Sequence, residues 1–176
     1  MQLEGFYLRE REMGLFEIMS EDDKKNKYPE VFRQYESDPF YWTPPNGESM
    51  AQLCLRIDRV LHTLHRECSD KRVLIVGHGL VMWAFLVRIE RLTPTQFLER
   101  SHSRNIADQI RNCQIIHYTR RDPTGGDLAK RMEWVRSVCP WDANQPGGSW
   151  RTIQRPTFTN EQLREEADSS PRIIAG

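Results

Sequence analysis

The hydrophobic pattern is clearest in the middle of the chain, where it predicts one long amphipathic helix. Ser49 is a good N-cap, and Gln52 three positions later completes a capping box. Apolar residues then recur at spacings of three and four, which places them on one helix face. This stripe consists of Met50, Leu53, Cys54, Ile57, Val60, Leu61 and Leu64. We therefore expect a helix whose apolar face is buried in a core.

A second apolar unit follows this helix with a different period. Residues 73–76 read Val-Leu-Ile-Val, a short aliphatic run typical of a strand that is covered on both faces. Gly77-His78-Gly79 ends the run, and Leu80–Ile89 is a strongly apolar helix. The order helix, strand, glycine turn, helix is that of an α/β unit.

The remaining segments predict short elements. Residues 21–27 are polar and fit a solvated helix or a loop, residues 28–35 can form a short helix, and Thr93-Pro94 begins another. Residues 113–118 (CQIIHY) are a good strand candidate, whereas residues 132–138 (MEWVRSV) fit a strand or a helix. A buried parallel strand needs neighbours on both sides, so these few strands fall short of an independently stable sheet.

Length and composition favour one domain followed by a tail. The chain has 176 residues, of which 38% are hydrophobic, and its mean hydropathy of -0.69 is polar for a globular domain. Residues 139–176 are rich in Pro, Gly, Ser and polar side chains, so we expect a tail that wraps the domain or is partly disordered. The predicted domain is therefore 1–138 and the tail 139–176.

Charge and cysteine use exclude several function classes. Lys plus Arg and Asp plus Glu both number 25, so the overall basic field of nucleic-acid or membrane-surface binders is missing. The longest apolar run, Leu80–Val87, is too short to span a bilayer, and the start has no signal-peptide pattern. The four cysteines lack the spacing of a zinc ribbon or a disulfide scaffold. We expect a soluble cytoplasmic protein with reduced thiols.

The glycine-flanked His78 is the first candidate for chemistry. It lies where a strand ends and a helix begins, and there free backbone N–H groups and the helix dipole favour an anion. Gly79 allows close approach to the helix terminus. The alternative is a histidine that satisfies the helix terminus without any ligand. The third glycine of GxGxxG and the serine of a nucleophile elbow are both missing here.

The charged stretch at residues 8–14 (LREREMG) is the second candidate. Glu10 is a carboxylic acid that can protonate a leaving oxygen, while Arg9 and Arg11 beside it can hold phosphate. The alternative is a solvated charged face. His62 and His65 share one helix face, but without a third ligand they are better interpreted as surface histidines, and we predict no metal site.

Three motifs in series resemble the second half of a histidine phosphatase, in the phosphoglycerate mutase-like superfamily. They are LREREMG, Asn46-Gly47-Glu48-Ser49 before the amphipathic helix, and VLIVGHG after it. Their order and spacing match from Leu8 to about Tyr118. The resemblance implies an α/β, three-layer sandwich with a mostly parallel sheet, which would be incomplete in this chain.

The resemblance also implies roles for individual residues. Glu10 falls on the catalytic acid of the family, with Arg11 beside it, and His78 with Gly79 falls on the second active-site histidine. The segments VMWAF, RIER and NCQIIHYTRRDP look closest to broad-range acid phosphatases. This implies a phosphorylated small molecule as substrate, hydrolysed through a phosphohistidine without a metal or an organic cofactor.

Two departures weaken the match to an active enzyme. Family members begin with a strand ending in Arg-His-Gly, whose histidine attacks phosphorus, and the residues before Leu8 contain no counterpart. Leu80 also stands where this subgroup has a polar residue. We therefore expect little or no phosphatase activity from this polypeptide alone.

Three hypotheses remain open at this stage. The chain is an incomplete phosphatase, or a non-enzymatic anion-binding or regulatory module that keeps His78, Arg9 and Arg11, or a plain α/β interaction module. The last would cover its exposed sheet edge with a partner strand, including by self-association.

Overall fold

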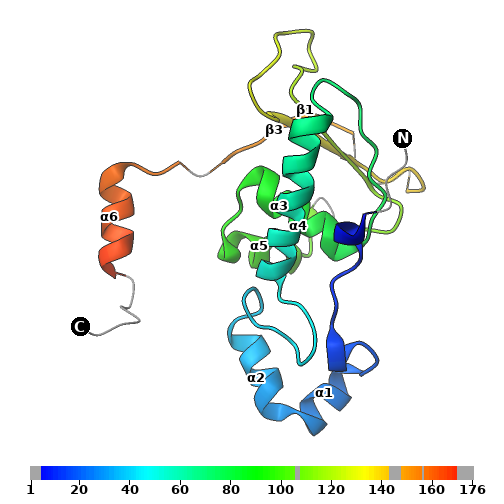
Figure 1. Cartoon of the computed structure of the whole chain (residues 1–176), viewed down its shortest axis with the longest axis vertical. Helices are drawn as coiled ribbons and strands as arrows, with labels where there is room; N and C mark the ends of the chain where they lie inside the picture. Colours follow the sequence, from blue (N-terminus) through cyan, green and yellow to red (C-terminus); the bar gives the residue numbers. More distant parts are fainter. Residues whose placement is uncertain (1–4, 106–107, 143–147, 156, 170–176) are drawn as a thin grey trace.

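A computed structural model describes residues 5–105, 108–142, 148–155 and 157–169. Figure 1 shows a helical body with a small sheet at one end, while the last helix stands apart from the body. The helical elements are η1 (Phe6–Leu8), η2 (Gly14–Phe16), α1 (Glu21–Lys27), α2 (Pro29–Ser37), α3 (Met50–Glu67), α4 (Gly79–Glu90), α5 (Pro94–Ser101) and α6 (Asn160–Ser169). The strands are β1 (Ile115–Thr119), β2 (Trp134–Val138) and β3 (Arg151–Thr152).

The core lies between α3 and α4. The predicted α3 is confirmed, and both hydrogen bonds of its capping box are present between Ser49 and Gln52. The first half of its apolar stripe is buried, with Leu53 and Ile57 fully enclosed, and the second half, from Val60 on, is partly buried. The predicted apolar helix is also confirmed as α4, which packs along α3 and buries Val81. Burial of the apolar face, rather than helix propensity alone, therefore fixes this pair.

The shorter helices follow their local signals. α5 begins at Thr93-Pro94 as predicted, with a capping box between Thr93 and Gln96. α1 and α2 form a separate pair beneath the body in Figure 1. Aromatic rings connect this pair to the turn that precedes α3, because Trp42 stacks on Phe16 at 5.6 Å and meets Tyr35 edge-on at 5.2 Å.

The sheet has three strands in the order β1-β2-β3, and both pairings are antiparallel. β1 confirms the strand predicted at residues 113–118, and β2 shows that residues 132–138 form a strand. Val135 of β2 is 2% exposed and is paired with Tyr118, so this face of the sheet points into the core. The described part of the chain therefore contains both helices and strands. Its sheet is antiparallel, so the predicted mostly parallel sheet is not confirmed.

The strand predicted at residues 73–76 is wrong for this structure. Leu74 and Val76 are each 85% exposed, and Val73 is 48% exposed. Among the described residues, none forms a backbone hydrogen bond with residues 72–77. The physical reason is that a strand exists only through a neighbour, and the described residues offer this apolar run none on either side.

The segment after residue 138 is partly packed on the body and partly separate. β3 pairs with β2, and Ile153 is 4% exposed. α6 forms away from the body because its start carries local signals: Thr159 and Gln162 exchange the two bonds of a capping box. The boundary between a domain 1–138 and a tail 139–176 stays a prediction.

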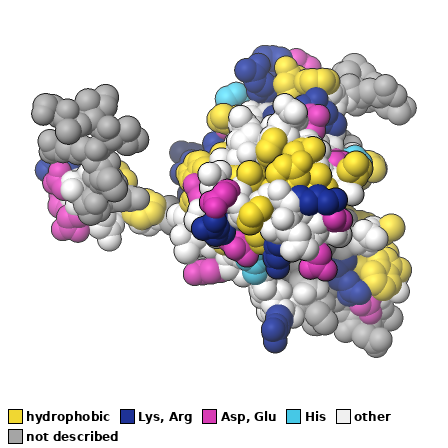
Figure 2. Space-filling model, turned by 90° about the horizontal axis from the view of Figure 1, so that it is seen from below, with side chains coloured by type: hydrophobic (Ala, Val, Ile, Leu, Met, Phe, Trp, Pro, Cys, Tyr) yellow, Lys and Arg dark blue, Asp and Glu magenta, His cyan; other side chains and the backbone are white. Residues whose placement is uncertain are grey.

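The surface of the body is not uniformly polar. Figure 2 shows hydrophobic side chains gathered on the face seen from below, with acidic and basic side chains around them. In the part of the chain that the structure describes, none of the helices is long and apolar enough to cross a membrane.

We predict that Ile57→Ala lowers the free energy of unfolding by about 2–5 kcal/mol, because it leaves a cavity in the α3–α4 core. Leu55→Ala is the matched control, since Leu55 lies on the same helix but is 64% exposed; its effect should stay within about 0.5 kcal/mol. Urea unfolding followed by circular dichroism measures both. Equal losses in the two variants would contradict this core assignment.

Candidate active site

The LREREMG and NGES motifs are joined through their backbones. The Glu48 N–H donates to the Glu12 carbonyl at 2.8 Å. A Cβ on Gly47 would lie 2.6 Å from that same carbonyl oxygen, and one on Gly14, at φ +53°, would lie 2.1 Å from the Pro45 carbonyl oxygen. Both positions therefore require glycine, which gives a physical reason for the glycine in each motif.

Arg56 holds these motifs to helix α3. Its side chain is 7% exposed, and its Nε and Nη2 donate to the two carboxylate oxygens of Glu48 at 2.9 and 2.7 Å. Its Nη1 also donates to the backbone carbonyls of Tyr7 and Arg9, at 2.9 Å for Arg9. This fork of bonds fixes the backbone immediately before Glu10.

Glu10 and Arg11 differ sharply in their surroundings. The half-buried Glu10 carboxylate accepts the Arg11 N–H at 2.8 Å. The Arg11 side chain is buried, its Nε donates to the Glu48 carbonyl at 2.7 Å, and its Nη2 finds no partner among the described residues. Burial lowers the pKa of the Arg11 guanidinium, although the nearby Tyr35, Glu48 and Glu10 oppose this.

Arg9 faces solvent instead. Its guanidinium lies 3.6 Å from the Glu12 carboxylate and 4.6 Å from the centre of the Phe6 ring. The two predicted phosphate-binding arginines therefore point into different environments. Their role in binding phosphate stays a prediction.

His78 is the N-cap residue of α4, so its predicted place at a helix start is confirmed, but the strand predicted before it is not formed. The backbone of His78 is extended, and its carbonyl accepts the Met82 N–H at 2.9 Å. The His78 side chain is exposed and does not cap the helix. Gly79 is open, because a Cβ there would meet no atom within 4 Å. The first turn of α4 therefore presents N–H groups that no described side chain caps, the arrangement that binds anions.

The sequence predicts that Glu10 and His78 converge, but no contact within the described chain brings them together. Within the described chain no hydrogen bond or ion pair links the two side chains, and neither of them lines a hollow at the end of α4 or the hollow between α4 and the sheet. One hollow adjoins the end of α4, between Val87 and Leu92, and the other lies between α4 and the sheet. His78 follows residues 72–77, which no sheet holds, so its convergence with Glu10 stays a prediction.

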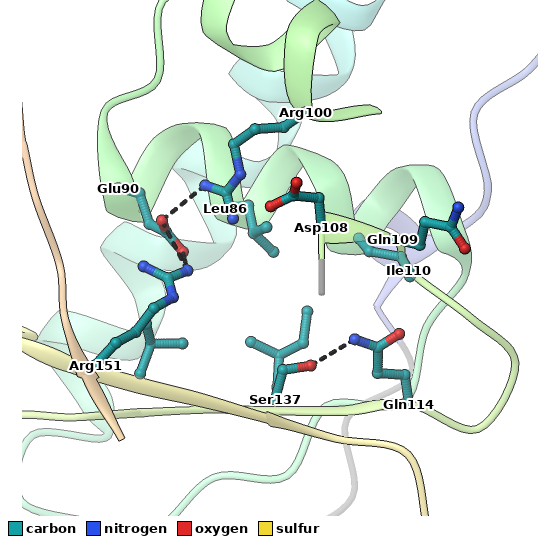
Figure 3. A pocket seen from close by; sticks show the side chains of 11 residues that line it. Leu86, Glu90, Arg100, Asp108, Gln109, Ile110, Gln114, Ser137 and Arg151 are labelled. Atoms are coloured by element: carbon teal, nitrogen blue, oxygen red, sulfur yellow. Dashed lines mark hydrogen bonds and ion pairs between the residues drawn. The ribbon is translucent and has the colours of Figure 1, made fainter. Parts of the chain in front are cut away.

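A buried carboxylate that the sequence analysis missed lies beside the second hollow (Figure 3). Glu90 is 2% exposed and accepts Arg100 Nη1 at 2.9 Å, Arg151 Nη2 at 2.9 and 3.1 Å, and the Tyr118 hydroxyl at 2.9 Å. Its partners lie 10 to 61 residues away along the chain, so the RIER segment alone gave no signal.

The electrostatics of Glu90 indicate a structural role. Burial acts to raise the pKa of its carboxyl, but the bonds and charges of Arg151 and Arg100 outweigh this and lower the pKa overall. Burial is the main cause that raises the pKa of the Tyr118 hydroxyl, and the charge of Glu90 raises it further. The adjacent hollow of about 40 Å³ has room for little more than water. This saturated carboxylate links α4, α5, β1 and β3.

The described residues include no group of three or more His, Cys, Asp or Glu side chains arranged to hold a metal ion. His62 and His65 are both exposed on α3.

Comparison with known proteins shows what the chain is similar to. The model of the histidine phosphatase superfamily (branch 1) matches residues 7–121. Over 151 residues, 76% of this chain, it is 32% identical to the rat 6-phosphofructo-2-kinase/fructose-2,6-bisphosphatase 1. Over 99 residues, 53% of this chain, it is 30% identical to a Brucella melitensis 2,3-bisphosphoglycerate-dependent phosphoglycerate mutase.

These relatives are longer proteins. The match spans 30% of the rat protein and 46% of the Brucella protein. Among solved structures, mycobacterial hydrolase 1 is 16% identical with a TM-score of 0.46, and the match covers 88% of this chain and 63% of that one.

We predict that Glu90→Gln lowers the free energy of unfolding by about 2–3 kcal/mol at pH 7. This loss is smaller than the loss expected when a fully buried ion pair is broken, because Arg151 is half exposed. The folded pKa of Glu90 lies below its ordinary value of 4.5, so its contribution is present above that value. It is lost as the pH falls through the folded pKa. Chemical unfolding between pH 7 and pH 3 should therefore show a flatter pH profile for this variant.

Glu99→Gln serves as the control, since Glu99 is exposed on α5. Its profile should follow that of the unaltered protein. A Glu90→Gln profile as steep as the control's would contradict the assigned pKa shift.

Proposed function

This chain belongs to the histidine phosphatase superfamily (branch 1), and we propose that it carries the phosphate-holding and proton-donating part of a phosphomonoesterase site. His78 and the first turn of α4 hold the phosphoryl oxygens, with Gly79 allowing close approach. Glu10 protonates the leaving oxygen. Arg9 and Arg11 add positive charge beside it.

The uncapped start of α4 is the observation that carries this proposal. Its N–H groups have no side-chain cap in the described chain, and the exposed His78 stands at the cap position. The positive end of the helix dipole favours a phosphoryl group there, and the imidazole adds a further donor. An open Gly79 leaves space for an anion of that size.

The setting of Glu10 supports its role as the acid. Arg56 fixes the carbonyl of the preceding residue, and the Arg11 N–H orients the Glu10 carboxylate. A proton donor works only when it is positioned, and this network supplies the positioning. The same network leaves one buried Nη2 group of Arg11 without a partner among the described residues, close to the carboxylate.

We further propose that turnover by this chain alone is low. The family's attack on phosphorus needs the histidine of an Arg-His-Gly segment, and the 176 residues contain no such triplet. Without covalent capture the rate falls by orders of magnitude. Leu80, which stands beside the site where this subgroup has a polar residue, also favours low turnover.

The finer assignment remains a proposal too. The segments VMWAF, RIER and NCQIIHYTRRDP favour the broad-range acid phosphatase subgroup, within a mostly parallel three-layer sandwich once the sheet is complete. The substrate would be a phosphorylated small molecule, and the chemistry needs no cofactor. All four cysteines are free thiols, which favours the cytoplasm.

A second candidate is a non-enzymatic anion-binding or regulatory module. It is favoured by the same uncapped helix start together with the missing nucleophile. Binding and turnover separate the two candidates, because the module binds phosphate without any hydrolysis.

We predict saturable binding of inorganic phosphate that weakens at least tenfold in His78→Ala, a loss of about 1.4 kcal/mol or more. Heteronuclear NMR titration measures the affinity and reports whether the first-turn amides of α4 respond. His62→Ala is the matched control, because His62 is equally exposed but lies on α3. Its affinity should equal that of the unaltered chain.

Hydrolysis of p-nitrophenyl phosphate completes the test. We expect no turnover above background in the unaltered chain. Absence of any phosphate binding would overturn the site itself. Turnover that disappears in His78→Ala without a second chain would overturn the low-activity proposal and leave the site standing.

A further inference from the structure

The outer face of the sheet gathers positive charge around one indole ring. His117 of β1 and Arg136 of β2 are paired in register, so their side chains share the face opposite to the buried Val135. The Arg136 guanidinium lies 4.8 Å from the centre of the Trp150 ring, and the centre of the His117 ring lies 4.9 Å from the same ring. The charge of Arg72 also acts on His117. We call Arg72, His117, Arg136 and Trp150 the cationic face.

The two arginines of the cationic face form no ion pair with any described residue. At the other side of the sheet, by contrast, Arg151 binds Glu90, and Arg155 lies 3.5 Å from the Glu133 carboxylate. Partial burial, and next the charges of Arg136 and Arg72, lower the pKa of the His117 imidazole, because a further positive charge is unfavourable there. The cationic face therefore favours an anionic group.

Helix α6 carries acidic side chains along one side. At roughly 100° per residue, Glu161, Glu165 and Asp168 fall within about 60° of one another around the helix axis. Leu163 and Ala167 lie on the opposite side. The helix stands apart from the body in Figure 1, and its described side chains form no ion pair within the described chain. This acidic stripe is therefore complementary in charge to the cationic face.

The connection between the sheet and α6 is long enough to bring the two surfaces together. The Arg155 side chain is 7% exposed and is held beside Glu133, at the start of β2. Arg136 lies three residues further along this strand, a distance of about 10 Å. An extended chain from Arg155 to Asn160 spans up to about 17 Å. The first turn of α6 can therefore reach the cationic face.

The tether selects α6 as the occupant of this face. Single exposed ion pairs contribute little, so a free acidic peptide of the same length would bind weakly. A short linker instead holds the attached helix at an effective concentration on the order of millimolar. Three carboxylates on one side of a preformed helix then meet the face together.

We propose that α6 docks reversibly on the cationic face of its own chain, with Glu161, Glu165 and Asp168 directed towards Arg72 and Arg136. The arrangement in Figure 1, in which α6 stands apart, is the open form of this equilibrium. Docking is independent of phosphate binding at the start of α4.

Heteronuclear NMR of the full chain tests the proposal through the indole N–H of Trp150 and the ring of His117. Glu165→Gln should lower the ratio of docked to open chains at least threefold, which moves both signals. Salt at about 1 M, which screens charges beyond about 3 Å, should move them in the same direction. Ala167→Lys is the matched control, because it changes the net charge of α6 by the same amount on the opposite side of the helix. It should leave both signals in place.

Charge reversal on both surfaces tests the pairing itself. Glu161→Lys with Glu165→Lys should abolish docking, and Arg72→Glu with Arg136→Glu should do the same. The chain that combines all four substitutions should recover it. The amide shifts of α6 are the readout for these variants, because replacing Arg136 itself alters the surroundings of Trp150.

The same spectra at several protein concentrations separate docking within one chain from docking between chains. Shifts that do not depend on concentration support the proposal. Shifts that appear only as the concentration rises overturn it. Signals of Trp150 and His117 that ignore both Glu165→Gln and salt also overturn it, as does a fourfold variant no better than its two parents.

Discussion

The position of the N-terminal motif depends on one buried cation, Arg56. Its guanidinium joins the Glu48 carboxylate to backbone carbonyls at the start of the chain, so three separate segments meet at a single side chain. A charge this deeply buried is tolerated only because its hydrogen bonds are satisfied. These bonds position Glu10, because they fix the backbone immediately before it. The two glycines that allow the motifs to touch complete the same unit.

The sequence predicted what depends on neighbours along the chain. Capping residues and apolar spacing were enough for α3, α4 and α5, because a helix closes its hydrogen bonds within itself. β1 could also be recognised from its aliphatic residues. Residues 73–76 carry an equally strong strand signal and form no strand. A strand depends on a partner, and no local pattern reports whether that partner is present.

The same distinction between local and long-range signals applies to the residues of the candidate site. His78 was predicted as a site residue because it stands at a helix start, and Glu10 was predicted because it belongs to a recognisable motif. Arg56 and Glu90 were missed, since their roles arise from contacts 8 to 61 residues apart. For Arg56, the only signal in the sequence was a charged residue on the apolar face of the predicted helix. Whether the two halves of the site meet depends on residues 72–77, the stretch that the sheet does not hold.

The link between Glu90 and Arg151 has a consequence for how the chain is made. Synthesis proceeds from the N-terminus, so the carboxylate leaves the ribosome 61 residues before its principal counter-charge. Until then α4 can sequester this acid only with the help of Arg100, and the sheet lacks its third strand. This contact between α4 and the sheet can therefore form only after residue 151 has left the ribosome.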